Sequence, residues 1–400
     1  MKKQSRSQRA WRMTAWMLLF ILASGPRALA VETGALVPPM EQQPVLRSAT
    51  ICSIGDFVIH DAILESARQV DGSYDFAPML TYINECMGAA DYTVANVDGP
   101  MGGAGERGYR GYPQFNTPPV LIGALLDAGV DMLTLSNNHA LDTYFSGLKA
   151  EIENCEAYGM DFVGGARTQQ EHDQPVIRSI NGISVGFLNY TQFANTMEQY
   201  CEKAASVYGI NFTGRADFDG DVARLREAGA DVVVAYMHWG TEYQRSADSA
   251  QKKYARMLVE AGCDVIIGGH PHVVQPAYWL TGTRHSDGGE QRTLCVFSLG
   301  NFLSDQRKQY RDGGILFEFT IQETEDGAFE IVAPRYIPTY VWRSGSKSSG
   351  YVYRVLPCEP WLWTSPEGMD DAAHQRLAEV WMEMTDLMET GNAGAVAVKQ

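Results

Sequence analysis

The feature that most constrains the fold is a series of five short apolar segments, each of which ends in polar residues or glycine. The segments are rich in Val, Ile and Leu, which is typical of buried strands. Helix-like segments separate them, and three of these lead into a Gly-x-Asp step, where glycine ends a helix and a strand follows. This alternation predicts an α/β protein built in layers. The predicted strands are TICSIGDFVI, YTVANVD, DMLTLSN, DVVVAYMHW and DVIIGGH.

The rest of the pattern predicts a mixed sheet. Asn-Gly and Asp-Gly turn signals interrupt the strand-like stretches 176–190 and 293–340, so part of the sheet is expected to be antiparallel. Segment 367–390 has helical spacing with an apolar face, which predicts a helix that docks on the domain. The other predicted helices are 118–128, 145–158, 218–228 and 249–261.

The first thirty residues differ in composition from the rest of the chain. A basic stretch precedes an apolar run and an Ala-Leu-Ala step that a signal peptidase accepts, so we interpret residues 1–30 as an export signal. The apolar run is short for a bilayer span, but an uncleaved membrane anchor remains an alternative. We expect residues 31–48 to form a flexible leader, residues 49–345 the main domain, and residues 346–400 a C-terminal extension with the docking helix.

The chain is strongly acidic, with a net charge of −16. Removing the predicted signal takes away six basic residues and no acidic one, which leaves the exported chain at −22. A surface of this charge repels phosphate backbones and anionic membranes, so we expect no nucleic-acid partner.

Polar side chains follow each of the five predicted strands. In open α/β sheets, ligands bind beyond the carboxyl ends of the strands, where loops from separate strands meet. We therefore expect these side chains to converge at one edge of a sheet and to form a metal site. In chain order they are Asp56 and His60, then Asn96 and Asp98, then Asn137, Asn138, His139 and Asp142, then His238, and finally His270 and His272.

Each of these residues also has a structural interpretation of its own. Asp56 could be a helix N-cap, and Asp98 could open a turn. The Asn137-Asn138 step is compatible with turn backbone, and His238 could be a hydrogen-bonded core histidine. One shared site explains why polar residues recur at all five strand ends. The structural interpretations would need a separate local reason at each of them.

The His270-Pro-His272 segment is the most specific part of the pattern. In extended backbone, side chains two apart point the same way, so both imidazoles can reach one small volume. Imidazole, carboxylate and amide ligands without thiolate suit Mn, Fe or Zn, and the supply is large enough for two divalent ions. Two neighbouring ions can activate a bridging water and stabilise charge on an attacked phosphoryl or carbonyl group. Asp98 is the expected bridge between them.

A second group of residues is expected to act on the substrate. His139 lies next to an expected ligand and is the candidate catalytic proton donor, with Asp142 orienting its ring. A solvated acid is an equally good interpretation of Glu242, and a tight turn is the better interpretation of the Gly-Asn step that contains Asn301. The tentative substrate contacts are Asn96, Asn137, Glu242 and Asn301.

Six segments of this chain, in order, resemble the motif series of the CapA family, the poly-γ-glutamate capsule biosynthesis proteins. The segments are GDFVIHD, NVDGP, LSNNHALDTYFSGL, MHWGTEYQ, GCDVIIGGHPHVVQP and FSLGNFLSDQ. That family is related to the calcineurin-like metallophosphoesterases. The resemblance therefore implies a four-layer α-β-β-α sandwich of the metallophosphoesterase-like type, with mixed sheets and a two-metal site at the strand ends.

The resemblance also implies roles for individual residues. The chain departs from the family at Asp98, where Glu is usual, and at Gly269 and Ala277, where His and Glu are frequent; these departures bear on metal spacing and substrate, not on the fold. The implied roles are Asp56 and His60 for one metal, Asp98 as the bridge, Asn138 and His238 for the second metal, His270 and His272 divided between the two, and His139 facing the substrate.

Together these observations predict an exported, CapA-like, dinuclear-metal-dependent hydrolase or transferase in the metabolism of poly-γ-glutamate or another envelope polymer. Its expected location is outside the cell or at the cell surface. The first alternative is a non-catalytic surface module that tethers or exports a capsule polymer with membrane-bound synthase subunits. A solute-binding receptor is a third interpretation, disfavoured because no second lobe is evident in the sequence.

Overall fold

The computed structural model describes residues 46–105, 107–391, 394 and 396–397. The predicted export signal and most of the predicted leader lie outside these described residues. The first strand begins at Ser48, so the folded part starts within the last residues of the predicted leader.

In the described part of the chain, the first of two sheets contains nine strands in a mixed arrangement. Strands β1 to β4 are parallel to one another, and β12 pairs with β1 in the antiparallel sense. The order is β14-β13-β12-β1-β2-β3-β4, with β11 beside β1 and β15 beside β13. The strands are β1 (Ser48–Val58), β2 (Tyr92–Val97), β3 (Met132–Thr134), β4 (Asp161–Val163), β11 (Asn301–Ser304), β12 (Gly313–Glu323), β13 (Phe329–Ser346), β14 (Gly350–Pro357) and β15 (Val396–Ala397).

Among the residues that the structure describes, the second sheet contains six strands in the order β5-β6-β7-β8-β10-β9. Its four central strands are parallel, and the two edge strands, β5 and β9, are antiparallel to their neighbours. The antiparallel pairings of both sheets confirm the expectation of mixed sheets. The strands are β5 (Val176–Ile180), β6 (Ile183–Thr191), β7 (Val232–His238), β8 (Val265–Gly269), β9 (Val274–Thr283) and β10 (Glu290–Leu299).

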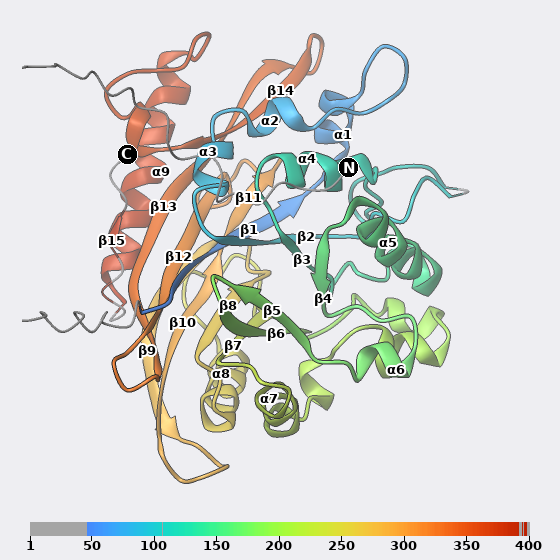
Figure 1. The fold of residues 1–400 in the computed structure, drawn as a ribbon. Helices are drawn as coiled ribbons and strands as arrows, with labels where there is room; N and C mark the ends of the chain where they lie inside the picture. The colour runs from blue at the N-terminus through green and yellow to red at the C-terminus, as the bar shows by residue number, and fades with distance from the viewer. Residues whose placement is uncertain (1–45, 106, 392–393, 395, 398–400) are drawn as a thin grey trace, which may run out of the picture. The chain divides into compact units, whose positions relative to one another are not determined.

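The two sheets pack face to face and helices cover both outer faces (Figure 1). Along β1 the faces alternate: Ala49 and Ile51 belong to the core between the sheets, and Cys52 and Ile54 to the core under α1 to α5. The predicted four-layer α-β-β-α sandwich is therefore confirmed. The helices are α1 (Asp61–Ala67), α2 (Ala77–Leu80), α3 (Asn84–Met87), α4 (Val120–Asp127) and α5 (Tyr144–Tyr158) on the first sheet, α7 (Phe218–Glu227) and α8 (Ser249–Ala261) on the second, and the short α6 (Gln169–His172), η2 (Met197–Tyr200), η3 (Ala205–Gly209), η4 (Thr213–Arg215) and η5 (Glu359–Trp361).

Helix α9 (Asp371–Glu389) packs along β13 and β9. Its buried residues Leu377, Val380 and Met384 join the core between the sheets, so α9 covers the apolar space between their edges. The first sheet extends beyond residue 345, where the main domain was predicted to end. Strand β14 lies in the predicted C-terminal extension, and all of its residues pair with β13.

The Gly-x-Asp steps that the sequence analysis noted have a common structural role. Gly129, Gly229 and Gly262 have φ of 102°, 94° and 92°, the left-handed region that glycine adopts without steric cost. In each step the Asp carboxylate accepts a hydrogen bond from a backbone N–H on the neighbouring parallel strand, which fixes where the two strands begin. The pairs and their N···O distances are Asp131 with Thr93 at 2.9 Å, Asp231 with Ser184 at 2.8 Å, and Asp264 with Val233 at 2.7 Å.

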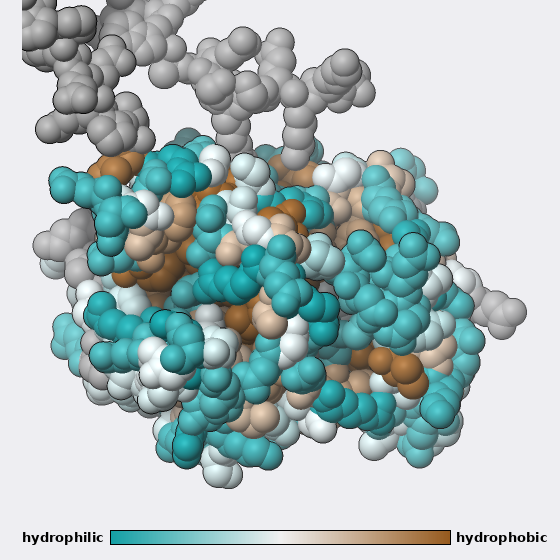
Figure 2. All heavy atoms as spheres, turned by 60° about the horizontal axis from the view of Figure 1, so that its bottom comes forward, coloured by the Kyte–Doolittle hydropathy of each residue, from teal (hydrophilic) through white to brown (hydrophobic). Residues whose placement is uncertain are grey.

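The surface shown in Figure 2 is mainly hydrophilic, with separate small hydrophobic patches. Among the described residues, no helix is both long enough and apolar enough to cross a membrane.

The buried carboxyl of Glu151, on α5, predicts how the stability of the protein depends on pH. It is buried, and burial raises the pKa of its carboxyl to about 8. The folded state therefore keeps a proton that the unfolded state releases above its ordinary pKa of 4.5, so stability falls as pH rises from 4.5 to about 8. We expect Glu151→Gln to remove up to about 4 kcal/mol of this pH-dependent loss, measured by denaturant unfolding at pH 5 and pH 9.

Glu153→Gln, at an exposed position on the same helix, is the matched control and should leave the pH dependence as in the wild type. An equal loss of stability in the wild type and Glu151→Gln would contradict the prediction.

Candidate metal centre

The candidate site lies where the carboxyl ends of strands from both sheets meet. The sequence pattern predicted convergence at one edge of one sheet, but β1, β2 and β3 belong to the first sheet, and β7 and β8 to the second. Polar contacts join the sheets here. The backbone N–H of His270 donates to Asp56 Oδ2 (3.0 Å), and His238 Nε2 lies 2.8 Å from Asn138 Oδ1.

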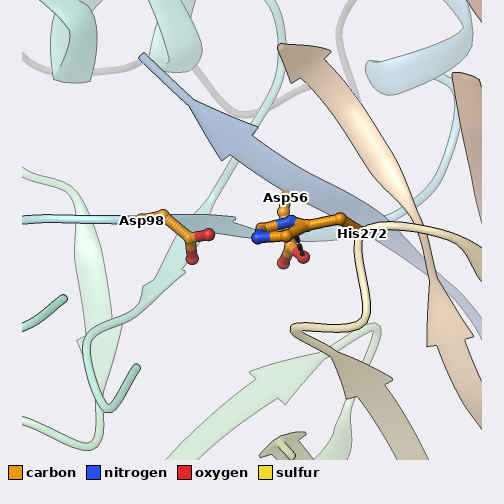
Figure 3. A group of neighbouring side chains, drawn as sticks. All are labelled: Asp56, Asp98 and His272. Atoms are coloured by element: carbon orange, nitrogen blue, oxygen red, sulfur yellow. Dashed lines mark ion pairs between the residues drawn. The ribbon is translucent and has the colours of Figure 1, made fainter. Parts of the chain in front are cut away.

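Asp56, Asp98 and His272 form the centre of the site. One ligand atom of each lies within 4.8 Å of the others, and all three side chains are buried. Figure 3 shows the two carboxylates and the imidazole ring turned toward one another. Asn96 Nδ2 donates to both carboxylates, at 2.8 Å to Asp56 Oδ1 and 2.7 Å to Asp98 Oδ1, and so holds the two acids in place.

The pKa values of these three residues are shifted in different directions by their surroundings. Burial acts to raise the pKa of Asp56, but the hydrogen bond with His272 and the charge of His238 outweigh it and lower the pKa to about 2. Burial and the charge of Asp56 raise the pKa of Asp98 to about 7. Burial acts to lower the pKa of His272, but its contacts with Asp56 and Asp98 raise it to about 9. A cation that binds here must therefore displace a proton from His272.

His238 and His270 form the second half of the site. Their ring centroids lie 4.9 Å apart, and His238 Nε2 lies 3.8 Å from Asp98 Oδ1. Burial lowers the pKa of His238 to about 3 and that of His270 well below its ordinary value. Both rings are therefore neutral at pH 7, the form in which imidazole binds metal ions.

Two buried acceptor atoms in the site lack a hydrogen-bond partner among the described residues. They are Asp98 Oδ2 and His270 Nδ1. Because buried polar atoms in native proteins are nearly always paired, atoms of this kind point to a missing ligand. Carboxylate, imidazole and amide donors also match Mn, Zn or Fe. The residues present therefore fit a divalent metal ion.

The His270-Pro-His272 segment reaches the site by a different backbone path from the one predicted. We expected extended backbone, but His270 and His272 have φ of 93° and 57° and follow the end of β8 in a turn. Their rings nevertheless lie 5.9 Å apart. The contact that positions them is tertiary, because the His270 N–H binds Asp56 on the other sheet.

The candidate proton donor His139 has a defined orientation. Its Nδ1 lies 2.7 Å from Asp142 Oδ2, which also accepts the backbone N–H of Phe115 at 2.6 Å. Asn195 Nδ2 lies 3.3 Å from His139 Nδ1, and Asn195 Oδ1 accepts from Asn138 Nδ2 at 3.3 Å. The sequence analysis did not select Asn195. It follows β6, a sixth strand with a polar end (TQFAN) that could have indicated it.

The remaining candidates surround this group. His60 Nδ1 lies 2.9 Å from the carbonyl oxygen of Val58, so its Nε2 is the nitrogen free to act as a ligand. Asn301 Oδ1 lies 3.0 Å from His272 Nδ1 and orients that ring. Asn137 binds backbone groups of Val97 and His139. Glu242 is exposed and outside the central group of three.

Comparison with known proteins gives a consistent family assignment. The family model described as "Bacterial capsule synthesis protein PGA_cap" matches residues 50–306, more than half of the chain. The chain is 25% identical over 256 residues to the PGA biosynthesis protein CapA of Bacillus subtilis (strain 168), covering 62% of this chain and 63% of that protein. It is 24% identical over 294 residues to the capsule biosynthesis protein CapA of Bacillus anthracis, covering 71% and 66%. The matches thus span less than two thirds of the length of these curated relatives.

Solved structures with a similar arrangement include calcineurin-like phosphoesterase YfkN from Bacillus subtilis, with a TM-score of 0.43 and 15% identity over 74% of this chain and 91% of that chain. Another is the NAD nucleotidase NadN of Haemophilus influenzae, with a TM-score of 0.45 and 11% identity over 89% of this chain and 65% of that chain.

Proposed function

Because the chain belongs to the family of bacterial capsule synthesis proteins, we propose that it is an exported, metal-dependent hydrolase or transferase that acts on poly-γ-glutamate or another capsule polymer. The observation that carries the proposal is the buried group of Asp56, Asp98 and His272, in which one carboxylate oxygen of Asp98 has no hydrogen-bond partner among the described residues. A protein that only tethers a polymer has no need of a buried, charged group with an unfilled acceptor.

The ligand supply is enough for two divalent ions. Ions bound there would supply Lewis-acid stabilisation of the charge that develops on an attacked carbonyl or phosphoryl group. His139, held by Asp142, donates a proton to the leaving group, and Asn195 limits the positions that the His139 ring can take. The residues that would hold the ions are Asp56, His60, Asp98, Asn138, His238, His270 and His272.

Export is supported by the basic and apolar pattern of residues 1–30, which lie outside the described residues. An exported enzyme would meet the polymer outside the cell or at the cell surface, where membrane-bound synthase subunits are the natural partners. A substrate with many carboxylates and an acidic protein repel each other, so bound cations and local cationic sites would have to bring the two together.

The test is metal analysis of the purified full chain, combined with a cleavage assay on poly-γ-glutamate. We expect about two equivalents of Mn, Zn or Fe, loss of cleavage after chelation, and recovery when one of these metals is added back. His285→Gln, at an exposed position that pairs with Asp219, is the control and should bind metal like the wild type.

The possible failures separate the two candidate functions. A chain that retains no metal after dialysis contradicts the metal site and with it the enzyme. Stoichiometric metal without turnover of any polymer, phosphoester or γ-glutamyl peptide favours the non-catalytic module.

A further inference from the structure

Two loops approach the metal centre on the side of His272. One, residues 239–248, follows β7, and the other, residues 305–312, follows β11. The centroid of the Tyr243 ring, on the first loop, lies 6.1 Å from that of the His272 ring, and the two planes are inclined by 32°. The guanidinium carbon of Arg311, on the second loop, lies 3.2 Å from the centroid of the Tyr243 ring. A continuous series of contacts therefore leads from the buried metal centre to two half-exposed side chains.

The metal centre also fixes the backbone on both sides of this stacking contact. Asn301 Nδ2 donates to the carbonyl oxygen of Arg311 (2.8 Å), and Asn301 Oδ1 lies 3.0 Å from His272 Nδ1. The backbone N–H of Tyr243 donates to the carbonyl oxygen of Pro271, which stands between the two histidines of the site (2.7 Å). Tyr243 has φ of 66°, a strained conformation for a large side chain and one that is common at functional sites. Arg311 is therefore held at a defined position relative to the metal centre.

The Arg311 guanidinium has no ion pair and no hydrogen bond with any described residue. The two acids of its own loop, Asp305 and Asp312, pair with other arginines. Glu242, the acid next to Tyr243, forms no ion pair with it either. Stacking uses the face of a guanidinium and leaves the five N–H donors at its edge. Arg311 therefore offers a positive charge and a planar set of donors, which is the arrangement that binds a carboxylate.

Arg245, on the other loop, makes the reciprocal contact but uses its donors within the protein. Its guanidinium carbon lies 4.0 Å from the centroid of the Tyr310 ring, and Tyr310 also has a positive φ, 71°. The Nη2 of Arg245 donates to the carbonyl oxygen of Glu383 on α9 (2.6 Å). Arg245 thus joins the two loops to α9, whereas Arg311 stacks in the same way and keeps its donors available.

We propose that Arg311, stacked on Tyr243, determines the specificity of the metal centre by binding a free carboxylate of the polymer next to the bond that reacts. The inference rests on the proposed function, because it assigns recognition of that substrate to a named residue. In a chain with a net charge of −16, a local cation beside the site offsets the repulsion between protein and polymer. Each γ-linked glutamyl unit carries one free carboxylate a few bonds from its amide, so anchoring the carboxylate brings a neighbouring amide to the metal centre.

The experiment measures binding of a γ-linked glutamate oligomer to the metal-loaded full chain by calorimetry. The same oligomer with its free carboxylates converted to primary amides is the uncharged probe. We expect Arg311→Gln to weaken binding of the carboxylate oligomer at least about tenfold, since it removes a charge-assisted, bidentate partner, and to leave binding of the amide oligomer unchanged. Arg311→Lys should give a smaller loss, because lysine keeps the charge without the planar donors. The metal content should stay as in the wild type.

Arg245→Gln is the matched control, because it removes the reciprocal stacking contact between the same two loops. It should bind both oligomers like the wild type. Equal affinity of the wild type and Arg311→Gln for the carboxylate oligomer overturns the proposal and leaves the metal-dependent function in place. The proposal also fails if Arg245→Gln shows the same loss, if Arg311→Gln loses both oligomers equally, or if inorganic phosphate binds more tightly than the oligomer. Arg311-dependent binding to a chain that holds no metal would keep the carboxylate site and refute only the proposed function.

Discussion

Replacing His139 by Gln is expected to lower kcat on the polymer about 10²–10⁴-fold while leaving the bound metal in place. The reason is that His139 lies beside the metal centre without being one of its three central residues. Its Nδ1 is held by Asp142, so the other ring nitrogen, which lies 3.4 Å from Asn195 Nδ2, is the one that would donate a proton to a leaving group. Steady-state kinetics and elemental analysis on the same preparation check both parts of the prediction.

Asp142→Asn separates orientation from proton donation. Replacing this positioning residue should lower kcat less than His139→Gln does, because the ring loses the contact that orients it but keeps the nitrogen that donates the proton. A purely structural role would lower the melting temperature and leave kcat of the folded variant unchanged. Full activity of His139→Gln would remove His139 from the mechanism altogether.

The strand ends of this protein could be read from the sequence because their physical signal is local. Asp56 and Asp98 each follow an apolar run, and the carboxyl ends of parallel strands share an edge. The same pattern does not predict that the strands belong to two sheets. The strands of both sheets are buried and rich in apolar residues, so the sequence does not distinguish them. Long-range contacts join the two edges, and the one between His270 and Asp56 spans 214 positions of the chain.

The sequence did not predict the backbone conformation of the loops. His270 and His272 were expected in extended backbone, and both adopt positive φ because a tertiary hydrogen bond and a turn fix them. Asn195 was missed for a related reason. It follows β6 at a distance of four residues, in a loop whose direction is set by packing and not by periodicity.

Asp98→Asn is expected to affect function and stability in opposite directions. The substitution keeps the shape of the side chain but removes one of the two carboxylates of the buried group, so metal affinity should fall by at least about 100-fold and polymer cleavage with it. The metal-free variant should nevertheless be more stable than the metal-free wild type at pH 8. Elemental analysis, kinetics and denaturant unfolding with and without chelator measure the three effects.

The gain in stability follows from the buried carboxylate pair. Burial and the charge of Asp56 raise the pKa of Asp98 to about 7 in the folded protein, above the ordinary value of 3.8, so ionisation of Asp98 costs stability as pH rises from 3.8 to about 7. An amide removes that cost, which is on the order of 2–4 kcal/mol above pH 7. Added metal should reverse the order, because it stabilises only the wild type. The prediction is wrong if chelated wild type and chelated Asp98→Asn unfold at the same denaturant concentration at pH 8. In that case ionisation of Asp98 does not destabilise the metal-free protein, and a bound cation has no such cost to offset.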